Sequence, residues 1–327
     1  MTMLAVGFLV SMILCILLGV PFIDFMKKHM YGQYIKELAP ENHAQKQGTP
    51  TMGGIFIIAS IVLASVITLF LAEKFSTTSI IILMTLLFYS FAGFQDDYIK
   101  IKDKGNDGLT PKQKFLRQLA IGVLPITFLM MMNPSATIVD LGFCEVHLGW
   151  LYPIFGLLVI TGASNAYNLT DGLDGLASFT GVFAFSACAI ICHLQGAHQE
   201  AIISACVVGA LVGFLKYNKP KAQVFMGDTG SLALGGLLGV LAVCGKFEIL
   251  MILIGAVFVC ETLSVMIQVT SFKLTGKRVF KMSPIHHHFE LCGWSEKKIV
   301  LVFGLISALC SVLSVLIFMW SNYGINK

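Results

Sequence analysis

Apolar segments long enough to cross a membrane run almost without interruption through this chain of 327 residues. A hydrocarbon core of about 30 Å needs roughly 20 apolar residues in a helix, because in the absence of water only helices and closed barrels satisfy their own backbone polar groups. We expect ten such spans, at 3–23, 52–72, 78–95, 115–132, 150–167, 175–193, 199–215, 230–245, 248–270 and 299–320. The sequence therefore predicts an all-α polytopic membrane protein with ten transmembrane helices, forming a single integral membrane domain over residues 1–327.

The composition agrees with a membrane protein. The chain is 56% hydrophobic and 12% charged, whereas soluble domains average about 25% charged residues. The formal net charge of +4 comes without a long basic run, so nucleic acid is not an expected partner. The nine cysteines include no CxxC pattern, and most of them lie in apolar runs, which is typical of small buried hydrophobic residues.

The basic residues predict the orientation of the chain. No basic residue precedes the first apolar segment, and Lys27 and Lys28 follow it, which indicates a transmembrane helix and not a signal peptide. With the N-terminus outside, the inner loops are 24–51, 96–114, 168–174, 216–229 and 271–298. Of the 22 Lys and Arg residues, only three (Lys74, Lys246 and Lys327) lie away from these loops. The positive-inside rule then places both termini outside, and we expect a small external β-hairpin between residues 133 and 150.

Four groups of acidic residues or histidines all fall in or beside the inner loops. The first is Asp96-Asp97, followed by Lys100, where the third span leaves the membrane. This pair could be an ordinary hydrated helix end balanced by nearby lysines. However, unpaired carboxylates at a membrane surface are costly, which favours a functional site.

The second group lies in the loop Asn168–Leu176, where Asp171 and Asp174 are three residues apart. On a helical turn the two carboxylates would share a face. The spacing differs from that of an EF-hand calcium loop. One of the two carboxylates could simply cap the following helix, but the loop has no Lys or Arg and suits a cation or a base.

The third group is Asp228, preceded by Gly227 at the start of the eighth span. Glycine permits close approach of a ligand, and a helix N-terminus offers free N–H groups to a phosphate. A capping role for Asp228 is the structural alternative. The chain has no Walker A or GxGxxG motif, so a bound phosphate would depend on Mg²⁺ and lysines.

The fourth group is the triplet His286-His287-His288, in the longest inner loop. In an extended chain only the first and third imidazoles share a side, so a zinc site is a weak interpretation. Imidazoles that contact a diphosphate fit better, and we expect at least one of the three histidines to be structural. Glu261 is the one acidic residue deep in a predicted span, and the sequence names no partner for it.

Together these motifs resemble those of the polyprenyl-phosphate N-acetylhexosamine 1-phosphate transferases, and within them the phospho-N-acetylmuramoyl-pentapeptide transferase branch. The resemblance covers nearly the whole chain and depends on six motifs in order. These are Gly48–Gly54, Asp96–Lys100, Leu109–Lys114, Asn168–Leu176, Gly227–Leu232 and Ser283–Glu290.

The resemblance implies a reaction and its setting. Phospho-MurNAc-pentapeptide would pass from UDP-MurNAc-pentapeptide to undecaprenyl phosphate, giving the first lipid intermediate of peptidoglycan synthesis (lipid I) and UMP. Similar enzymes are Mg²⁺-dependent homodimers with ten helices, which implies a bacterial cytoplasmic membrane protein whose active site faces the cytoplasm.

It also implies roles for particular residues. Asp228 matches the metal ligand, with Asp171 as a further candidate ligand. Asp96 matches the residue that contacts or deprotonates the lipid phosphate, and Asp97 supports it. The expected uridine and nucleoside pocket consists of Asp171, Gly172, Leu173, Asp174, Asn218, Phe225 (stacked on uracil) and Gln268. Residues expected around the phosphates and sugar are Lys46, Thr51, Lys100, Lys112, His286 and His287. Asn168, Gly227 and His288, from the same motifs, complete the substrate-binding set.

The chemistry is consistent with these roles. Mg²⁺ keeps several waters and needs one or two protein carboxylates, and phosphoryl transfer depends on neutralising charge. Because a lipid phosphate is already ionised at neutral pH, Asp96 could orient the phosphate and not deprotonate it. Direct attack and an aspartyl-phosphate intermediate are both compatible with the sequence.

Three other functions fit the sequence less well. A transporter would place its polar site near the bilayer midplane, whereas these clusters lie at one surface. A sister enzyme that transfers GlcNAc 1-phosphate would share the fold and the metal chemistry, and a comparison of donor substrates separates the two. A non-catalytic scaffold would not need these acidic and histidine groups on one face.

Overall fold

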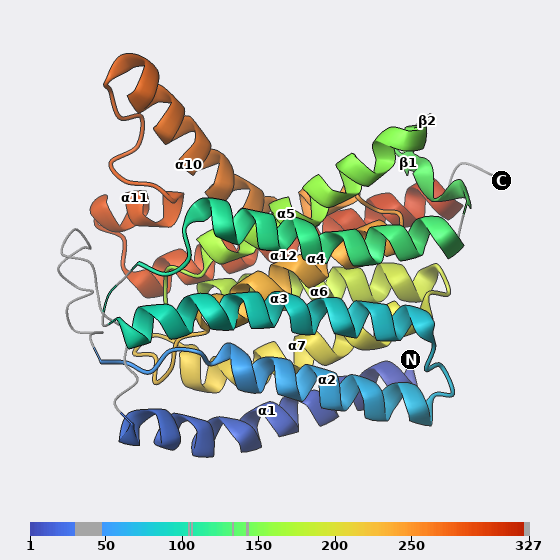
Figure 1. The fold of residues 1–327 in the computed structure, drawn as a ribbon, viewed down its shortest axis with the longest axis horizontal. Helices are drawn as coiled ribbons and strands as arrows, with labels where there is room; N and C mark the ends of the chain where they lie inside the picture. Colours follow the sequence, from blue (N-terminus) through green and yellow to red (C-terminus); the bar gives the residue numbers. More distant parts are fainter. Residues whose placement is uncertain (30–47, 104, 106, 133, 142–143, 324–327) are drawn as a thin grey trace.

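The computed structural model describes residues 1–29, 48–103, 105, 107–132, 134–141 and 144–323, and they form a bundle of long helices (Figure 1). The helices are α1 (Thr2–Lys28), α2 (Gly54–Leu71), α3 (Thr77–Lys102), α4 (Pro111–Met132), α5 (Tyr152–Thr170), α6 (Leu176–Leu194), α7 (His198–Asn218), α8 (Gly227–Cys244), α9 (Leu250–Ile254), α10 (Ala256–Thr275), α11 (Ile285–Leu291) and α12 (Glu296–Tyr323). Two strands, β1 (Ile138–Asp140) and β2 (Glu145–His147), lie between the short 3₁₀ helices η2 (Pro134–Thr137) and η3 (Gly149–Leu151).

Nine helices in the described residues are long and apolar enough to cross a membrane, which confirms the all-α polytopic class. The expected number was ten. The fifth expected span corresponds to α5, which is not among the nine. Its polar side chains are satisfied inside the bundle: Ser164 donates to the Leu232 carbonyl oxygen at 2.9 Å, and Asn165 donates to Gln118 at 2.8 Å.

Two expected boundaries differ from the structure in a way that matters for the site. The helix α3 continues past residue 95 to Lys102, and α4 begins at Pro111, before residue 115. Both extensions are rich in charged and polar residues, which hydropathy excludes from a span but which continue the helix. As a result, Lys100 and Lys114 occupy helical positions at one end of the bundle.

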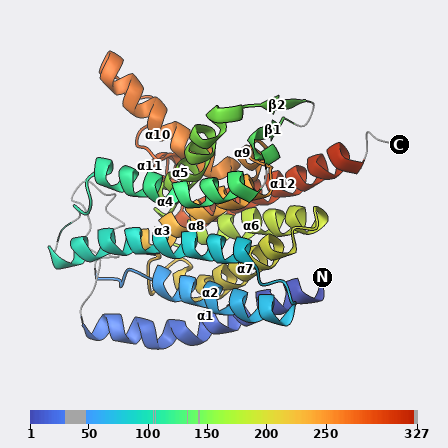
Figure 2. The same cartoon turned by 45° about the vertical axis from the view of Figure 1, so that its right-hand side comes forward.

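The ninth expected span, 248–270, is divided at Gly255 into α9 and α10. The helix α10 leaves the bundle after this break and projects away from the other helices in both views (Figures 1 and 2).

The helix α8 forms the centre of the bundle, and nearly all of its residues are buried. Glycines let its neighbours approach closely, as is common between membrane helices. A Cβ atom at Gly239 would lie 2.6 Å from the Cα of Ile160 on α5, and one at Gly236 would lie 2.9 Å from the ring of Tyr89 on α3. The middle of α8 is therefore held between α3 and α5.

The two ends of the bundle differ in character. The N-terminus, the end of α12 and the β1–β2 hairpin lie at one end, and α11 lies at the other (Figure 1). The hairpin that the sequence predicts is present, and its strands are antiparallel with Val139 paired to Val146. At this end Lys246 donates to the Ala136 carbonyl oxygen at 2.8 Å and to the Tyr152 hydroxyl at 2.9 Å, which links the hairpin segment to the helices.

Candidate active site

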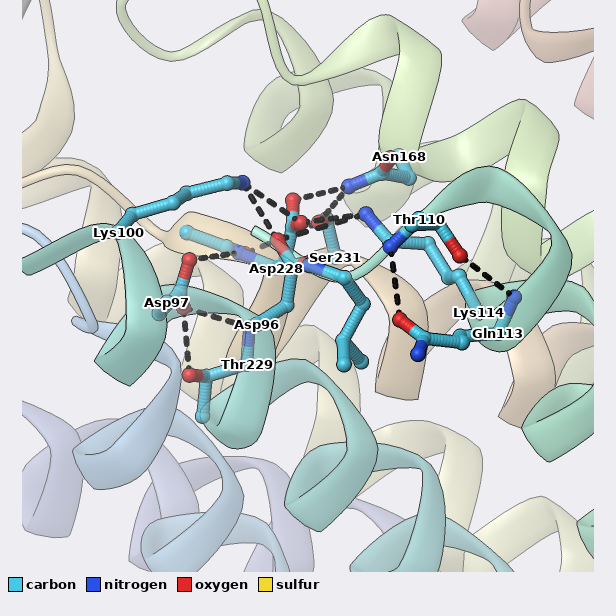
Figure 3. A network of polar contacts seen from close by, with 12 residues as sticks. Asp96, Asp97, Lys100, Thr110, Gln113, Lys114, Asn168, Asp228, Thr229 and Ser231 are labelled. Atoms are coloured by element: carbon cyan, nitrogen blue, oxygen red, sulfur yellow. Dashed lines mark hydrogen bonds and ion pairs between the residues drawn. The ribbon is translucent and has the colours of Figure 1, made fainter. Parts of the chain in front are cut away.

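Asp228 lies in the first turn of α8, at the end of the bundle opposite the hairpin. Its Oδ2 atom accepts from the Lys100 ammonium at 2.9 Å and from the Lys114 ammonium at 2.7 Å. Its Oδ1 atom accepts from the Asn168 amide at 2.7 Å (Figure 3). Three helices, α3, α4 and α5, thus direct a polar side chain at one carboxylate.

Asp96 lies beside this carboxylate and shares its lysines. Its Oδ2 atom is 2.5 Å from the Lys100 ammonium and 3.5 Å from the Lys114 ammonium, and its Oδ1 atom accepts from the Leu109 backbone N–H at 2.8 Å. The loop approaches so closely that a Cβ atom at Gly108 would lie 2.5 Å from the carboxylate. The side chain of Asp96 is 1% exposed. Two carboxylates and two ammonium groups form the centre of the site.

Asp97 has a different environment, although it is adjacent in sequence. Its carboxylate accepts from the backbone N–H groups of Asp228 (3.0 Å) and Thr229 (2.9 Å) and from the Thr229 hydroxyl (2.6 Å). It therefore caps α8 from a neighbouring helix. A Cβ atom at Gly227, which has a φ of +74°, would lie 2.6 Å from Asp97 and 3.0 Å from the Thr51 hydroxyl, so only glycine fits there.

Asp96, Asp97 and Asp228 provide oxygen atoms that all lie within 4.8 Å of one another, which suits a divalent cation. Carboxylate oxygens are the ligands that Mg²⁺ prefers. Asp171, expected as a further metal ligand, is not a member of this group. Desolvation, together with the negative charges of Asp228 and Asp97, raises the pKa of Asp171 well above its usual value. The role of Asp171 as a further metal ligand stays a prediction, and the structure adds Asp96 and Asp97 as candidate ligands.

Lys114 is the main residue that the sequence interpretation missed, since it chose Lys112 from the same motif. Lys112 is exposed, and no contact with the carboxylates places it in the centre. Thr110 and Gln113 exchange hydrogen bonds at the start of α4 and fix its first turn (Figure 3). Lys114 lies four residues before Gln118 and so shares its helix face, and the structure shows that Gln118 is buried and that this face meets the bundle.

In the loop before α6, two residues expected in the nucleoside pocket hold the structure together. The Asp174 carboxylate accepts from the backbone N–H groups of Lys221 (3.0 Å) and Ala222 (2.9 Å). Leu173 is buried in a small apolar cluster that includes Phe303. Both side chains fix the loop 171–175 in place, and their contacts with a ligand stay a prediction.

Asn218 and Gln268, also expected in that pocket, use their amides within the chain. Asn218 accepts from the Gly175 backbone N–H at 3.1 Å and donates to the Val224 carbonyl oxygen at 3.0 Å. Gln268 donates to the Phe280 carbonyl oxygen at 2.8 Å and accepts from the backbone N–H of the same residue at 2.9 Å. These amides shape the loops of the site.

Phe225 belongs to a segment that pairs with the Gly48–Gly54 motif. Its backbone N–H donates to the Pro50 carbonyl oxygen at 2.8 Å, and its carbonyl oxygen accepts from the Gly53 N–H at 2.9 Å. The phenyl ring is half-buried. Lys46, expected near the phosphates, lies outside the described residues.

The three histidines belong to the short helix α11, so the extended conformation assumed from the sequence is wrong. The ring centroids of His286 and His287 lie 4.2 Å apart, but the three side chains have different hydrogen-bond partners. The His287 Nδ1 atom lies 2.6 Å from Glu290, and the His288 Nδ1 atom accepts from the Lys281 backbone N–H at 3.1 Å. His286 is fully buried. His288 is thus engaged in holding its own loop.

Glu261, which had no partner in the sequence, contacts His286. The Oε1 atom of this fully buried carboxylate lies 3.0 Å from the His286 Nδ1 atom. The His286 ring also lies against Gly172, where a Cβ atom would be 2.3 Å from the Nε2 atom. The histidine loop therefore meets the loop 171–175 at the edge of the site.

Comparison with known proteins agrees with these motifs. The model of the family Glycosyl transferase family 4 matches residues 79–246, and the phospho-N-acetylmuramoyl-pentapeptide-transferase signature 1 matches residues 46–58. The chain is 48% identical to the phospho-N-acetylmuramoyl-pentapeptide-transferase of Bacillus subtilis over 321 residues, with 96% of each chain covered. It is 46% identical to the enzyme of the same name from Halalkalibacterium halodurans, over 95% of this chain and 96% of the relative. The chain therefore belongs to glycosyl transferase family 4 and, within it, to the phospho-N-acetylmuramoyl-pentapeptide transferases.

Proposed function

We propose that this protein transfers phospho-MurNAc-pentapeptide from UDP-MurNAc-pentapeptide to undecaprenyl phosphate, forming lipid I and UMP. The observation that carries the proposal is the centre formed by Asp96, Asp228, Lys100 and Lys114. Transfer between two phosphorylated substrates brings several negative charges together. A site for it must therefore supply positive charge, both from the protein and from a metal ion.

The metal in this proposal is Mg²⁺, held by Asp228 with Asp96 or Asp97. Carboxylates this close together repel one another unless positive charge lies between them. The ammonium groups of Lys100 and Lys114 supply part of that charge, and Mg²⁺ would supply the rest. Bound Mg²⁺ would neutralise diphosphate charge and polarise the bond that breaks. The ammonium groups of Lys100 and Lys114, which contact Asp228, would also contact oxygen atoms of the substrate phosphates.

In this proposal Asp96 contacts the phosphate of the lipid acceptor, undecaprenyl phosphate. The carboxylate is anchored by the Leu109 backbone N–H at 2.8 Å and by Lys100 at 2.5 Å, so its position is fixed. A fixed carboxylate beside two lysines orients a phosphate that the lysines attract. Asp97 also holds the first turn of α8, because its carboxylate accepts the backbone N–H groups of Asp228 and Thr229.

The donor nucleotide fits beside the loop 171–175 and the segment 224–227. Both are fixed by internal hydrogen bonds, so the half-buried ring of Phe225 and the backbone of Gly172 are preorganised. Stacking of uracil on the Phe225 ring would contribute roughly 1 to 3 kcal/mol, by analogy with base stacking on aromatic side chains.

An apolar cavity of about 270 Å³ provides a place for part of the polyprenyl chain. It lies between α5 and the α9–α10 break and is lined by Phe155, Val159, Gly162, Ile252, Phe258 and Leu263, among others. Ala166 also lines it, two residues before Asn168, which contacts Asp228. The helix α5 thus connects an apolar groove with the phosphate site.

We further propose that the active site faces the cytoplasm and that the protein works as a homodimer, as the resemblance implies. The free cysteines Cys144, at the hairpin, and Cys292, beside α11, test the orientation. Two variants, each retaining one of these as its only exposed cysteine, should react from opposite sides with a membrane-impermeant maleimide. Cross-linking in membranes, compared with detergent-dispersed protein, tests the dimer.

Release of UMP by the purified protein in detergent tests the proposed reaction. We expect release that requires UDP-MurNAc-pentapeptide, undecaprenyl phosphate and Mg²⁺ together, and that stops when EDTA removes the metal. UDP-GlcNAc, tested as the donor in place of UDP-MurNAc-pentapeptide, is the control. Faster turnover with UDP-GlcNAc, or UMP release without a lipid acceptor, would contradict the proposal.

A further inference from the structure

Glu261 is a buried carboxylate with an unusual pair of contacts. It lies in the second turn of α10, fully buried, in a helix that leaves the rest of the bundle. An isolated carboxylate at such a place is costly and is kept where it is paired or functional. Its partner is a single residue on another element, His286 of α11.

Both carboxylate oxygens face His286. Oε1 lies 3.0 Å from the ring Nδ1 atom, and Oε2 accepts from the backbone N–H at 3.4 Å. This N–H group belongs to the first turn of α11, where helix N–H groups have no partner within the helix. Glu261 therefore fixes both the position of the residue and the rotation of its ring.

These contacts determine which nitrogen of the ring is available. A carboxylate oxygen only accepts, so the proton of the neutral imidazole belongs on Nδ1. The Nε2 atom is then left with a lone pair. It is buried and has no hydrogen-bond partner in the described part of the chain.

The free nitrogen points at the loop on which the donor site depends. A Cβ atom at residue 172 would lie 2.3 Å from Nε2 and 2.7 Å from the adjacent ring carbon, so only glycine lets the backbone of this loop lie against the nitrogen. Asp171 and Asp174 flank this position in the sequence. A buried acceptor without a donor costs free energy, which a donor group from a ligand would recover.

We infer that Glu261 is a positioning residue of this enzyme. It holds His286 in the tautomer with the proton on Nδ1, so that Nε2 accepts a hydrogen bond from an N–H or O–H group of the nucleotide sugar. The inference rests on the proposed function for the identity of the substrate. In this inference His286 accepts a hydrogen bond from the nucleotide sugar, whereas Lys100 and Lys114 contact the phosphates.

Two variants separate positioning from simple structural support. Glu261→Gln keeps the size of the side chain, but its amide can donate to Nδ1 and so permits the other tautomer. We expect kcat/KM for the nucleotide sugar to fall by about 10- to 100-fold, by analogy with removal of the partner that orients a metal-bound histidine. Glu200→Gln is the matched control. It changes another buried carboxyl, at the start of α7, and should leave activity within twofold.

A double-mutant cycle tests whether Glu261 acts through His286. In a His286→Ala background, Glu261→Gln should lower kcat/KM by less than threefold, because the ring that it orients is absent. A full loss in that background would show a structural role and overturn the inference. So would unchanged activity of Glu261→Gln alone.

Nitrogen NMR of ¹⁵N-histidine-labelled protein gives a readout independent of turnover. The signals that disappear in His286→Ala identify this ring among the eight histidines. We expect a protonated Nδ1 and an unprotonated Nε2 in the parent protein, and a changed tautomer in Glu261→Gln. A ring protonated on Nε2 alone would overturn the inference. Failure of the parent protein to release UMP would contradict the proposed function and leave this measurement valid.

Discussion

The carboxylate of Asp97 accepts the backbone N–H of Asp228 at 3.0 Å, across a separation of 131 residues in the chain. The same carboxylate accepts two hydrogen bonds from Thr229. Adjacent aspartates on α3 therefore have separate functions. Asp96 faces the lysines, and Asp97 holds the helix that carries Asp228.

Replacement of Asp97 by Ala should lower both stability and turnover. Loss of the carboxylate leaves two N–H groups at the start of α8 without their partner, which costs about 1 to 3 kcal/mol for each buried unsatisfied group. We expect a lower thermal midpoint in detergent and at least tenfold lower kcat. Thr229→Val, which removes only the hydroxyl contact, is the milder control. Equal thermal midpoints for Asp97→Ala and the parent would contradict a capping role.

Lys114 and Lys112 form a matched pair, two residues apart on α4. The Lys114 ammonium lies 2.7 Å from Asp228, whereas the Lys112 side chain is exposed. Lys114→Gln should lower kcat by about 10²-fold or more, since charge stabilisation of this kind contributes roughly 3 to 4 kcal/mol. Lys112→Gln should change kcat by less than threefold. A larger loss for Lys112→Gln would restore the interpretation made from the sequence.

Asp228 and Asp96 should differ in metal binding. Asp228→Asn keeps the size and removes the charge, so we expect turnover to fall by more than about 10³-fold and Mg²⁺ affinity to fall with it. Asp96→Asn should lower turnover severely while nucleotide binding stays within a few-fold. Calorimetry of Mg²⁺ and of the nucleotide sugar on both variants measures the difference. Loss of Mg²⁺ binding in Asp96→Asn alone would reverse the two roles.

A methyl group at residue 172 should displace the His286 ring. In Gly172→Ala the new Cβ atom would lie 2.3 Å from the Nε2 atom. We expect KM for UDP-MurNAc-pentapeptide to rise by about tenfold or more, because the ring and the loop cannot both keep their positions. Gly105→Ala is the control, since its nearest heavy atom would be 3.7 Å away. Unchanged KM in Gly172→Ala would exclude this contact from donor binding.

A large side chain at residue 162 should block the apolar cavity beside α5. Gly162 lines the cavity and is exposed, and a Cβ atom there would meet nothing within 4 Å, so Gly162→Phe can be accommodated without strain. We expect KM for undecaprenyl phosphate to rise about tenfold, while KM for the nucleotide sugar stays the same. A short-chain prenyl phosphate that does not reach the cavity should be affected less. Equal effects on both acceptors would place the lipid chain elsewhere.

The sequence by itself determined the class of fold, because burial in a bilayer permits few solutions for long apolar segments. The position of nine spans and the hairpin followed from hydropathy and turn residues. The polar helix α5 shows the limit of this reasoning, since its side chains Ser164 and Asn165 are satisfied only by other helices.

Only the tertiary structure shows which residue of each motif faces the site. The resemblance gave Asp96 and Asp97 different roles but named no partner for either, and the rotation of about 100° between helical neighbours gives them different partners. The same geometry selects Lys114 over Lys112. Such differences depend on which side of a helix faces the bundle, and this follows from packing.

Contacts between distant segments could not be predicted from the sequence. Glu261 was visible as a costly buried acid, but its partner His286 lies 25 residues away on another helix. Their meeting depends on the turn of the chain after α10 and on the bare surface of Gly172. Local patterns specify helices, whereas the approach of one helix to another is fixed only when all the side chains between them are packed.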